Sequence, residues 1–214
     1  MSLSAEWPRL LHLLSLPAEP AVLVAAPDSD DVMQALADAR PRARVTLLDV
    51  TPEPRPAPAA PVAHRIPLIP GSDLDLAEGS FDLALLDHAI DDIVVEAVAH
   101  HDGIHLDPHG DRSEYSPRAR AVRAYWRSGD LEAVAAPALV RVVQSCLRAL
   151  RPSARMIFHH RVVDAHLAGG HPFDLYTDYL PLARRWIAKA RIDFREIALD
   201  SFDPAWWMCL ERAF

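Results

Sequence analysis

Short apolar runs alternate with amphipathic stretches along most of the chain. Continuous apolar runs are typical of strands buried on both faces of a sheet, whereas apolar residues three and four positions apart are typical of helices. The expected strands are 21–26, 44–50, 62–66, 81–87, 155–160, 194–199 and 206–212. The expected helices are 30–39, 91–101, 131–150 and 175–190, together with an N-terminal helix whose end is 10–16.

This alternation predicts an α/β fold, namely a Rossmann-like, seven-stranded, mostly parallel sheet with helices on both faces. The last two strands are joined by a short connection, which favours an antiparallel C-terminal strand pair. We expect residues 1–214 to form a single domain. Residues 102–130 mix glycine and proline with histidine, arginine and aromatic residues, and predict an inserted lid made of loop and short helical turns.

Composition narrows the classes of partner. The chain has 22 basic and 30 acidic residues and a net charge of −8, which argues against a nucleic-acid partner. Cys146 and Cys209 lie in apolar runs, as expected for buried free thiols in a reducing cytoplasm. The N-terminus lacks the basic start of a signal peptide, and no apolar run is long enough for a membrane span. We therefore expect a cytoplasmic protein with no membrane partner.

Acidic residues follow three of the expected strands. Asp28 follows the first, Asp49 ends the second and Asp87 ends the fourth. In parallel sheets these ends lie together, and an acid after the second strand is placed to bind ribose hydroxyls. The first loop, 25–31, has no glycine and three acidic residues, which disfavours a dinucleotide pyrophosphate but tolerates a cationic ligand without phosphate.

The order of elements, the acid at Asp49 and the antiparallel C-terminal pair together resemble the class I S-adenosylmethionine-dependent methyltransferases. Residues 71–87 are similar to that family's adenine loop and fourth strand, and residues 147–157 to its turn before the fifth strand. The family's glycine-rich first motif is degenerate here, because the first glycine of the chain is Gly71.

The resemblance implies a function. The chain would bind S-adenosylmethionine (SAM) and transfer its methyl group to a small-molecule acceptor by in-line attack, with proximity and orientation as the main catalytic effects. His88 would be the proton acceptor where the acceptor must lose a proton. The implied cofactor positions are Ala25, Ala26 and Asp28 for the methionine part, Asp49 for the ribose, Ser72 and Asp73 for the adenine, and Asp87 at the reaction end.

Several alternatives stay open at this point. His88 can equally be a histidine hydrogen-bonded to loop backbone. Tyr115 and Trp126 either line an acceptor pocket or anchor the lid. Trp206 and Trp207 either pack on the sheet or contact a second copy, which is compatible with a homodimer.

Two other functional classes are also open. The fold can serve as a catalytically inactive binding or dimerisation module, as the missing glycines suggest. It can also be a metal-dependent enzyme that uses the histidines of 88–109, since imidazole and carboxylate suit zinc or iron. Their spacing specifies no ligand set, so no residue is assigned to a metal.

Overall fold

The computed structural model describes residues 6–25, 30–49, 62–69, 72–104, 117–161 and 173–212. The strands in these ranges form one seven-stranded sheet of order β3-β2-β1-β4-β5-β7-β6. Strands β1 to β5 pair in parallel, and β7 is antiparallel to both of its neighbours. The strands are β1 (Ala21–Ala25), β2 (Arg44–Asp49), β3 (Val62–Pro67), β4 (Phe81–Asp87), β5 (Leu150–His159), β6 (Phe194–Ile197) and β7 (Trp207–Arg212). The predicted fold class is confirmed.

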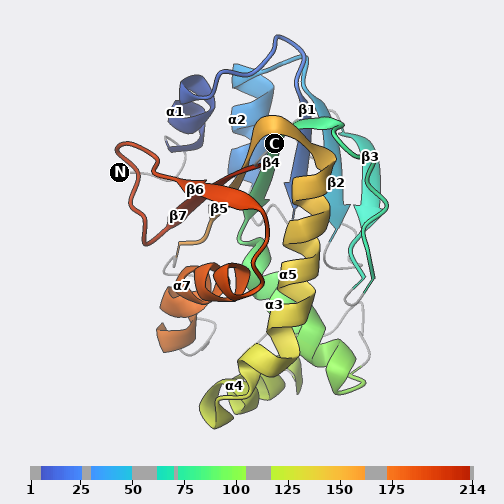
Figure 1. The fold of residues 1–214 in the computed structure, drawn as a ribbon, viewed down its shortest axis with the longest axis vertical. Helices are drawn as coiled ribbons and strands as arrows, with labels where there is room; N and C mark the ends of the chain where they lie inside the picture. Colours follow the sequence, from blue (N-terminus) through green and yellow to red (C-terminus); the bar gives the residue numbers. More distant parts are fainter. Residues whose placement is uncertain are drawn as a thin grey trace.

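Helices cover both faces of this sheet (Figure 1). One face carries α1 (Glu6–Leu13) and α2 (Asp30–Ala39). The other carries α3 (Ala89–His101), α5 (Leu131–Ala149) and α7 (Phe173–Lys189), with α4 (Pro117–Ser128) packed beside α3. No described helix is both long enough and apolar enough to cross a bilayer.

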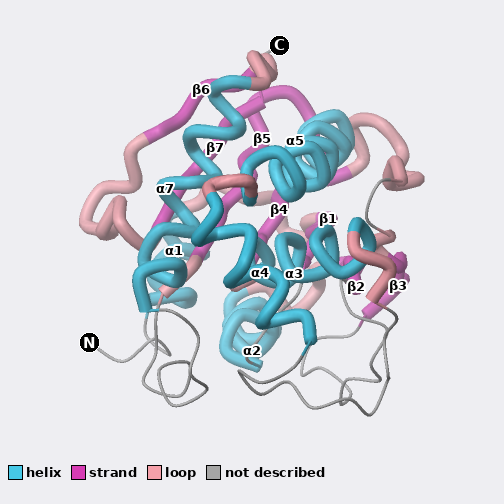
Figure 2. The backbone as a smooth tube through the Cα atoms, turned by 90° about the horizontal axis from the view of Figure 1, so that it is seen from below, coloured by secondary structure: helices cyan, strands magenta, loops and turns pink. Residues whose placement is uncertain are grey.

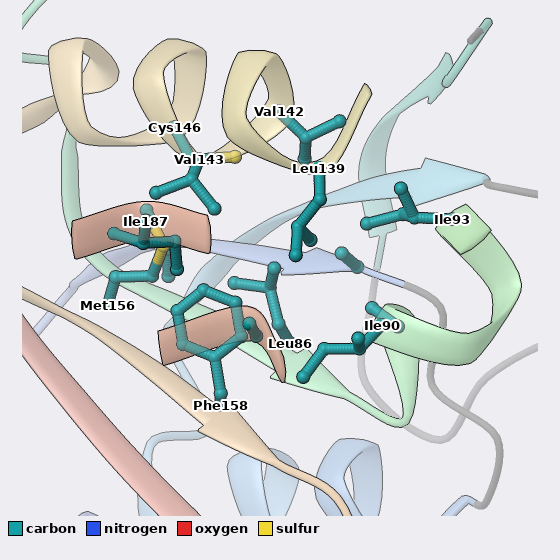
Figure 3. Close-up of a cluster of buried hydrophobic side chains, with 14 of the residues drawn as sticks. Leu86, Ile90, Ile93, Leu139, Val142, Val143, Cys146, Met156, Phe158 and Ile187 are labelled. Atoms are coloured by element: carbon teal, nitrogen blue, oxygen red, sulfur yellow. The ribbon is translucent and has the colours of Figure 1, made fainter. Parts of the chain in front are cut away.

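Alternate residues of each central strand pack into two different cores. On β1, Val22 and Val24 face α1 and α2, whereas Leu23 and Ala25 face α3 and α5. Because the strands are apolar on both faces, they appear in the sequence as continuous apolar runs. Figure 3 shows the second of these cores, in which the α5 side chains Leu139, Val143 and Cys146 point toward Leu86 and Phe158 of the sheet.

The parallel strands all end on one side of the molecule. Figure 1 shows β1 and β2 pointing toward the lower end, where α3 and α4 lie, and Figure 2 looks onto the molecule from that direction. Ligands of open α/β sheets bind at the carboxyl ends of the strands. This side therefore positions the candidate site.

Two local expectations were wrong. Residues 117–128 of the predicted lid form the continuous helix α4 rather than short turns. Pro117 suits the first helical position, and Gly129 (φ +83°) ends the helix in a conformation that favours glycine. Strand β5 begins at Leu150 rather than 155, because it continues through an irregularity in its pairing with β4 where Ser153 has φ +62°.

Candidate functional site

Asp87 and His159 form a buried pair at the carboxyl end of the sheet. They end β4 and β5, and the parallel register places them directly beside each other. His159 Nδ1 and Asp87 Oδ1 are 2.7 Å apart, and the two side chains are 2% and 1% exposed. A carboxylate at this distance orients the imidazole ring and determines which nitrogen carries the proton.

Two aromatic rings pack against the imidazole of this pair. The ring of His159 lies 4.3 Å from Trp207 of β7 and 5.5 Å from Trp7 of α1, measured between centroids. Trp207 is buried and also packs on Trp7 of α1, so of the two alternatives left open for Trp207 the structure shows packing within the chain. Among the described residues, neither Asp87 Oδ2 nor His159 Nε2 has a hydrogen-bond partner, although both atoms are buried.

His88 lies between this pair and a second histidine. It joins β4 to α3 with a left-handed backbone (φ 55°, ψ 14°), an uncommon conformation for a residue other than glycine. Its N–H donates to the carbonyl of His159 at 2.8 Å. Its buried ring lies 5.3 Å from that of His159 and 5.0 Å from that of His160. The main chain of His88 thus makes one hydrogen bond to backbone, and its ring lies beside the rings of two other histidines.

His160 and Asp91 complete the group. His160 Nδ1 is 3.8 Å from Asp91 Oδ1 in the first turn of α3, and the His160 ring lies 5.2 Å from that of Tyr179 on α7. We call Asp87, His88, Asp91, His159 and His160 the His–Asp cluster. Two of its triples, Asp87–His88–His159 and His88–Asp91–His160, have potential metal-ligating atoms within 4.8 Å of one another.

Sequence reasoning found two members of this cluster and missed three. It singled out Asp87 and His88 but assigned no role to Asp91, His159 or His160. A signal was present, because His159 and His160 follow an apolar strand just as Asp87 and His88 do. The adjacency of the two strands was the missing information, since strand order is not a local property of the sequence.

The predicted cofactor residues lie in different surroundings. Asp49 ends β2 as expected, with its side chain 22% exposed and both carboxylate oxygens 3.4 Å from Arg65 Nη1 of β3. Ala25 ends β1 and is buried between Leu48 and Leu86. Ala26 and Asp28 lie outside the described residues.

The two predicted adenine residues, Ser72 and Asp73, are exposed. Asp73 lines a pocket of about 400 Å³ together with Arg141 and Arg148. These arginines belong to the half of α5 that approaches the start of β5, so Asp73 faces the amino side of the sheet. The structure thus does not place Asp73 with Asp87 and His88.

The predicted acceptor residues are only partly described. Tyr115 lies outside the described residues. Trp126 is half-buried on α4 and packs against the core beneath α3 and α5, which is how an anchor of this helix would lie. Its neighbour Tyr125 donates a 2.7 Å hydrogen bond to Asp102, and this bond raises the pKa of the Tyr125 hydroxyl.

Of the histidines in 88–109 that were considered for a metal site, the structure describes His88, His100 and His101. His100 and His101 are exposed at the end of α3, and His101 contacts the ring of Tyr125. His105 and His109 lie outside the described residues. The metal-ligating groups found among the described residues lie instead in the His–Asp cluster.

Comparisons with known proteins bear on the fold. No protein-family model matches the chain, and a search of curated proteins finds no match. Solved structures do match. PH0851 does so with a TM-score of 0.52 at 13% identity, over 98% of this chain and 45% of its own. A SAM-dependent methyltransferase from Methanosarcina mazei has a TM-score of 0.46 at 11% identity, over 95% of this chain and 97% of its own.

The human N-acetylserotonin methyltransferase, solved with SAM, has a TM-score of 0.44 at 9% identity, over 98% of this chain and 52% of its own. The present chain therefore spans about half the length of the human enzyme and of PH0851. At such identities these likenesses concern the fold alone. The likeness to PH0851, whose TM-score is above 0.5, supports the overall fold.

Proposed function

We propose that this chain binds SAM at the carboxyl end of its sheet and transfers the methyl group to a small-molecule acceptor. The observation that carries the proposal is that acidic side chains end the two strands on either side of β1. Asp49 ends β2, which pairs with one edge of β1. Asp87, followed by His88, ends β4, which pairs with the other edge. A cofactor held by its ribose at Asp49 would reach across β1 toward the His–Asp cluster. The residue resemblance and the sheet topology support the same assignment.

The exposure of Asp49 and the charge at the start of α2 suit such a cofactor. Asp49 is partly exposed, and its long ion pair is with an arginine whose own side chain is 39% exposed. Arg65 can therefore turn into solvent when ribose hydroxyls take its place, because an exposed ion pair contributes little. The acidic start of α2 favours a sulfonium cation over a phosphate.

In this proposal the residues bind and orient rather than form covalent intermediates. Bound SAM supplies an electrophilic methyl group. Ala25, Ala26 and Asp28 would hold its methionine part, Asp49 its ribose and Ser72 its adenine, as the resemblance implies. Asp73 is left out of the adenine site, because it lines the pocket with Arg141 and Arg148 on the amino side of the sheet. Trp126 and Tyr115 would limit the acceptor's space. The role of His88 as proton acceptor stays a prediction, as do the cytoplasmic location and the homodimer.

Calorimetric titration with SAM and with S-adenosylhomocysteine tests the proposal. We expect Asp49→Ala to weaken binding about 10- to 150-fold, because hydrogen bonds to a charged group contribute about 1.5–3 kcal/mol. Asp75→Ala is the matched control, since Asp75 is an exposed acid on the connection that follows β3. Equal loss in both variants would contradict the assignment of Asp49.

Absence of binding by the wild-type protein at millimolar ligand would reject the methyltransferase proposal. The alternative function, a catalytically inactive module of the same fold, would then be favoured. The ion pair between Asp49 and Arg65 supports this inactive module, because the carboxylate then has a partner within the chain and needs no ribose.

A further inference from the structure

The His–Asp cluster brings together the donor atoms that transition-metal ions prefer. Imidazole nitrogens and a carboxylate oxygen suit zinc and iron, whereas magnesium and calcium prefer oxygen ligands alone. We propose that Asp87, His88 and His159 bind one divalent first-row transition-metal ion, with Zn²⁺ as the ion that fits this donor set. The proposal does not rest on methyl transfer or on SAM binding. It would replace the predicted role of His88 as proton acceptor, because an imidazole with one nitrogen on a metal and a proton on the other cannot take up a further proton.

The hydrogen bond between Asp87 and His159 leaves donor atoms for an ion. It uses Nδ1 of the imidazole and Oδ1 of the carboxylate, so His159 Nε2 and Asp87 Oδ2 remain. Both remaining atoms are buried and without a hydrogen-bond partner among the described residues. A buried polar atom left in this state is unfavourable. Each side chain can therefore bind a cation while their mutual hydrogen bond persists, and that bond would orient the imidazole as in many zinc sites.

His88 is the third ligand. One donor atom from each of Asp87, His88 and His159 lies within 4.8 Å of the others. Metal bonds of about 2.0–2.2 Å place any two ligand atoms no more than about 4.4 Å apart. Small side-chain rotations would thus close the set. The left-handed backbone of His88 is what turns the chain from β4 into α3 while keeping its ring beside the other two residues.

The surroundings also favour a single ion at this position. Trp7 and Trp207 exclude water from one side of His159. The attraction between a bound cation and the Asp87 carboxylate is stronger where water is excluded. The N-terminus of α3 carries the positive end of its helix dipole, and Asp91 and Asp92 in its first turn offset that charge.

The second triple, His88–Asp91–His160, shares His88 with the first, so the two compete for that ring. Asp91 is 17% exposed, whereas Asp87, His88 and His159 are all buried. The assignment to the first triple follows from this burial and from the unpartnered atoms of Asp87 and His159.

Metal content and cobalt spectroscopy of protein without a histidine tag test the proposal. We expect the purified protein to carry close to one equivalent of metal, and the chelator-stripped protein to bind one equivalent of Co²⁺ with visible absorption bands that Zn²⁺ abolishes. Less than a tenth of an equivalent, together with no cobalt bands, would overturn the proposal. This measurement needs no variant and no cofactor, so its result is independent of the SAM titration.

Variants identify the ligands. We expect Asp87→Asn, His88→Gln and His159→Gln each to weaken Zn²⁺ binding by about 100-fold or more, because even residues that only orient a ligand affect affinity by 10- to 100-fold. His100→Gln is the matched control on exposed α3 surface, and the double variant His105→Gln/His109→Gln tests the alternative site. Circular dichroism and a thermal melt confirm that each variant is folded.

Two outcomes of the variant series would overturn the assignment. One is loss of metal in His105→Gln/His109→Gln with retention in His159→Gln. The other is loss in Asp91→Asn and His160→Gln with retention in Asp87→Asn and His159→Gln, which would place the ion at the second triple.

Discussion

Two aspartates on β4 show how position decides the role of a residue. Asp82, near the start of the strand, accepts a 2.8 Å hydrogen bond from the N–H of Ala21 and forms an ion pair with Arg151. Asp87, at the carboxyl end, gives one oxygen to His159 and keeps the other buried without a hydrogen-bond partner among the described residues. The partners of Asp82 within the fold thus explain its position in the strand. The buried, unpartnered oxygen of Asp87 is better explained by a ligand that would bind it.

The two cysteines allow a prediction at the same scale. Burial raises the pKa of Cys146 to about 12 and that of Cys209 to about 11. Only the thiolate is reactive, and at pH 8 less than about one Cys146 in a thousand would be ionised. We expect neither thiol to react with Ellman's reagent in the native protein and both to react in guanidinium chloride. Rapid reaction of one native thiol would show that it is accessible.

At the scale of elements, the sequence predicted those strands and helices whose pattern is set by residues close together in the chain. The runs 21–25, 44–49 and 81–87 are apolar enough to identify buried strands directly. Helix α4 was missed because its apolar stripe is weak, with Val122 as its one buried residue. The glycine and proline residues nearby also favoured a loop. The pairing of Asp87 with His159 was missed because it joins residues 72 positions apart, through a strand order that no local pattern encodes.

An ion pair holds α4 against α3. Arg118 Nη1 lies 2.8 Å from Glu96 Oε1, and the two side chains are 18% and 8% exposed. We expect Arg118→Met to lower the free energy of unfolding by about 1.5–3 kcal/mol, because it removes a charged hydrogen bond from a buried carboxylate. Urea denaturation measures this change.

Two comparisons sharpen that measurement. Arg127→Ala is the control on exposed surface of α4 and should stay within about 0.5 kcal/mol of wild type. The double variant Arg118→Met/Glu96→Gln should recover part of the loss, since the carboxylate charge is then gone. If Arg118→Met and Arg127→Ala have equal effects, the ion pair does not contribute to stability.

At the scale of the whole molecule, the two cores share the same strands. β1, β4, β5 and β7 contribute residues to the core beneath α1 and α2 and to the core beneath α3, α5 and α7. Loss of either core would expose one face of every one of these strands. The sheet therefore couples the two helical layers, and we expect the molecule to unfold as one cooperative unit.

Matched truncations in the two layers test this coupling. Leu36 of α2 and Leu139 of α5 are both fully buried, one in each core. We expect Leu36→Ala and Leu139→Ala each to destabilise the protein by about 2–5 kcal/mol, through lost burial and the cavity left behind. Each variant should show one transition, at the same urea concentration by far-UV and near-UV circular dichroism. Two separate transitions in either variant would mean that one layer unfolds while the other persists, and the sheet would then not couple them.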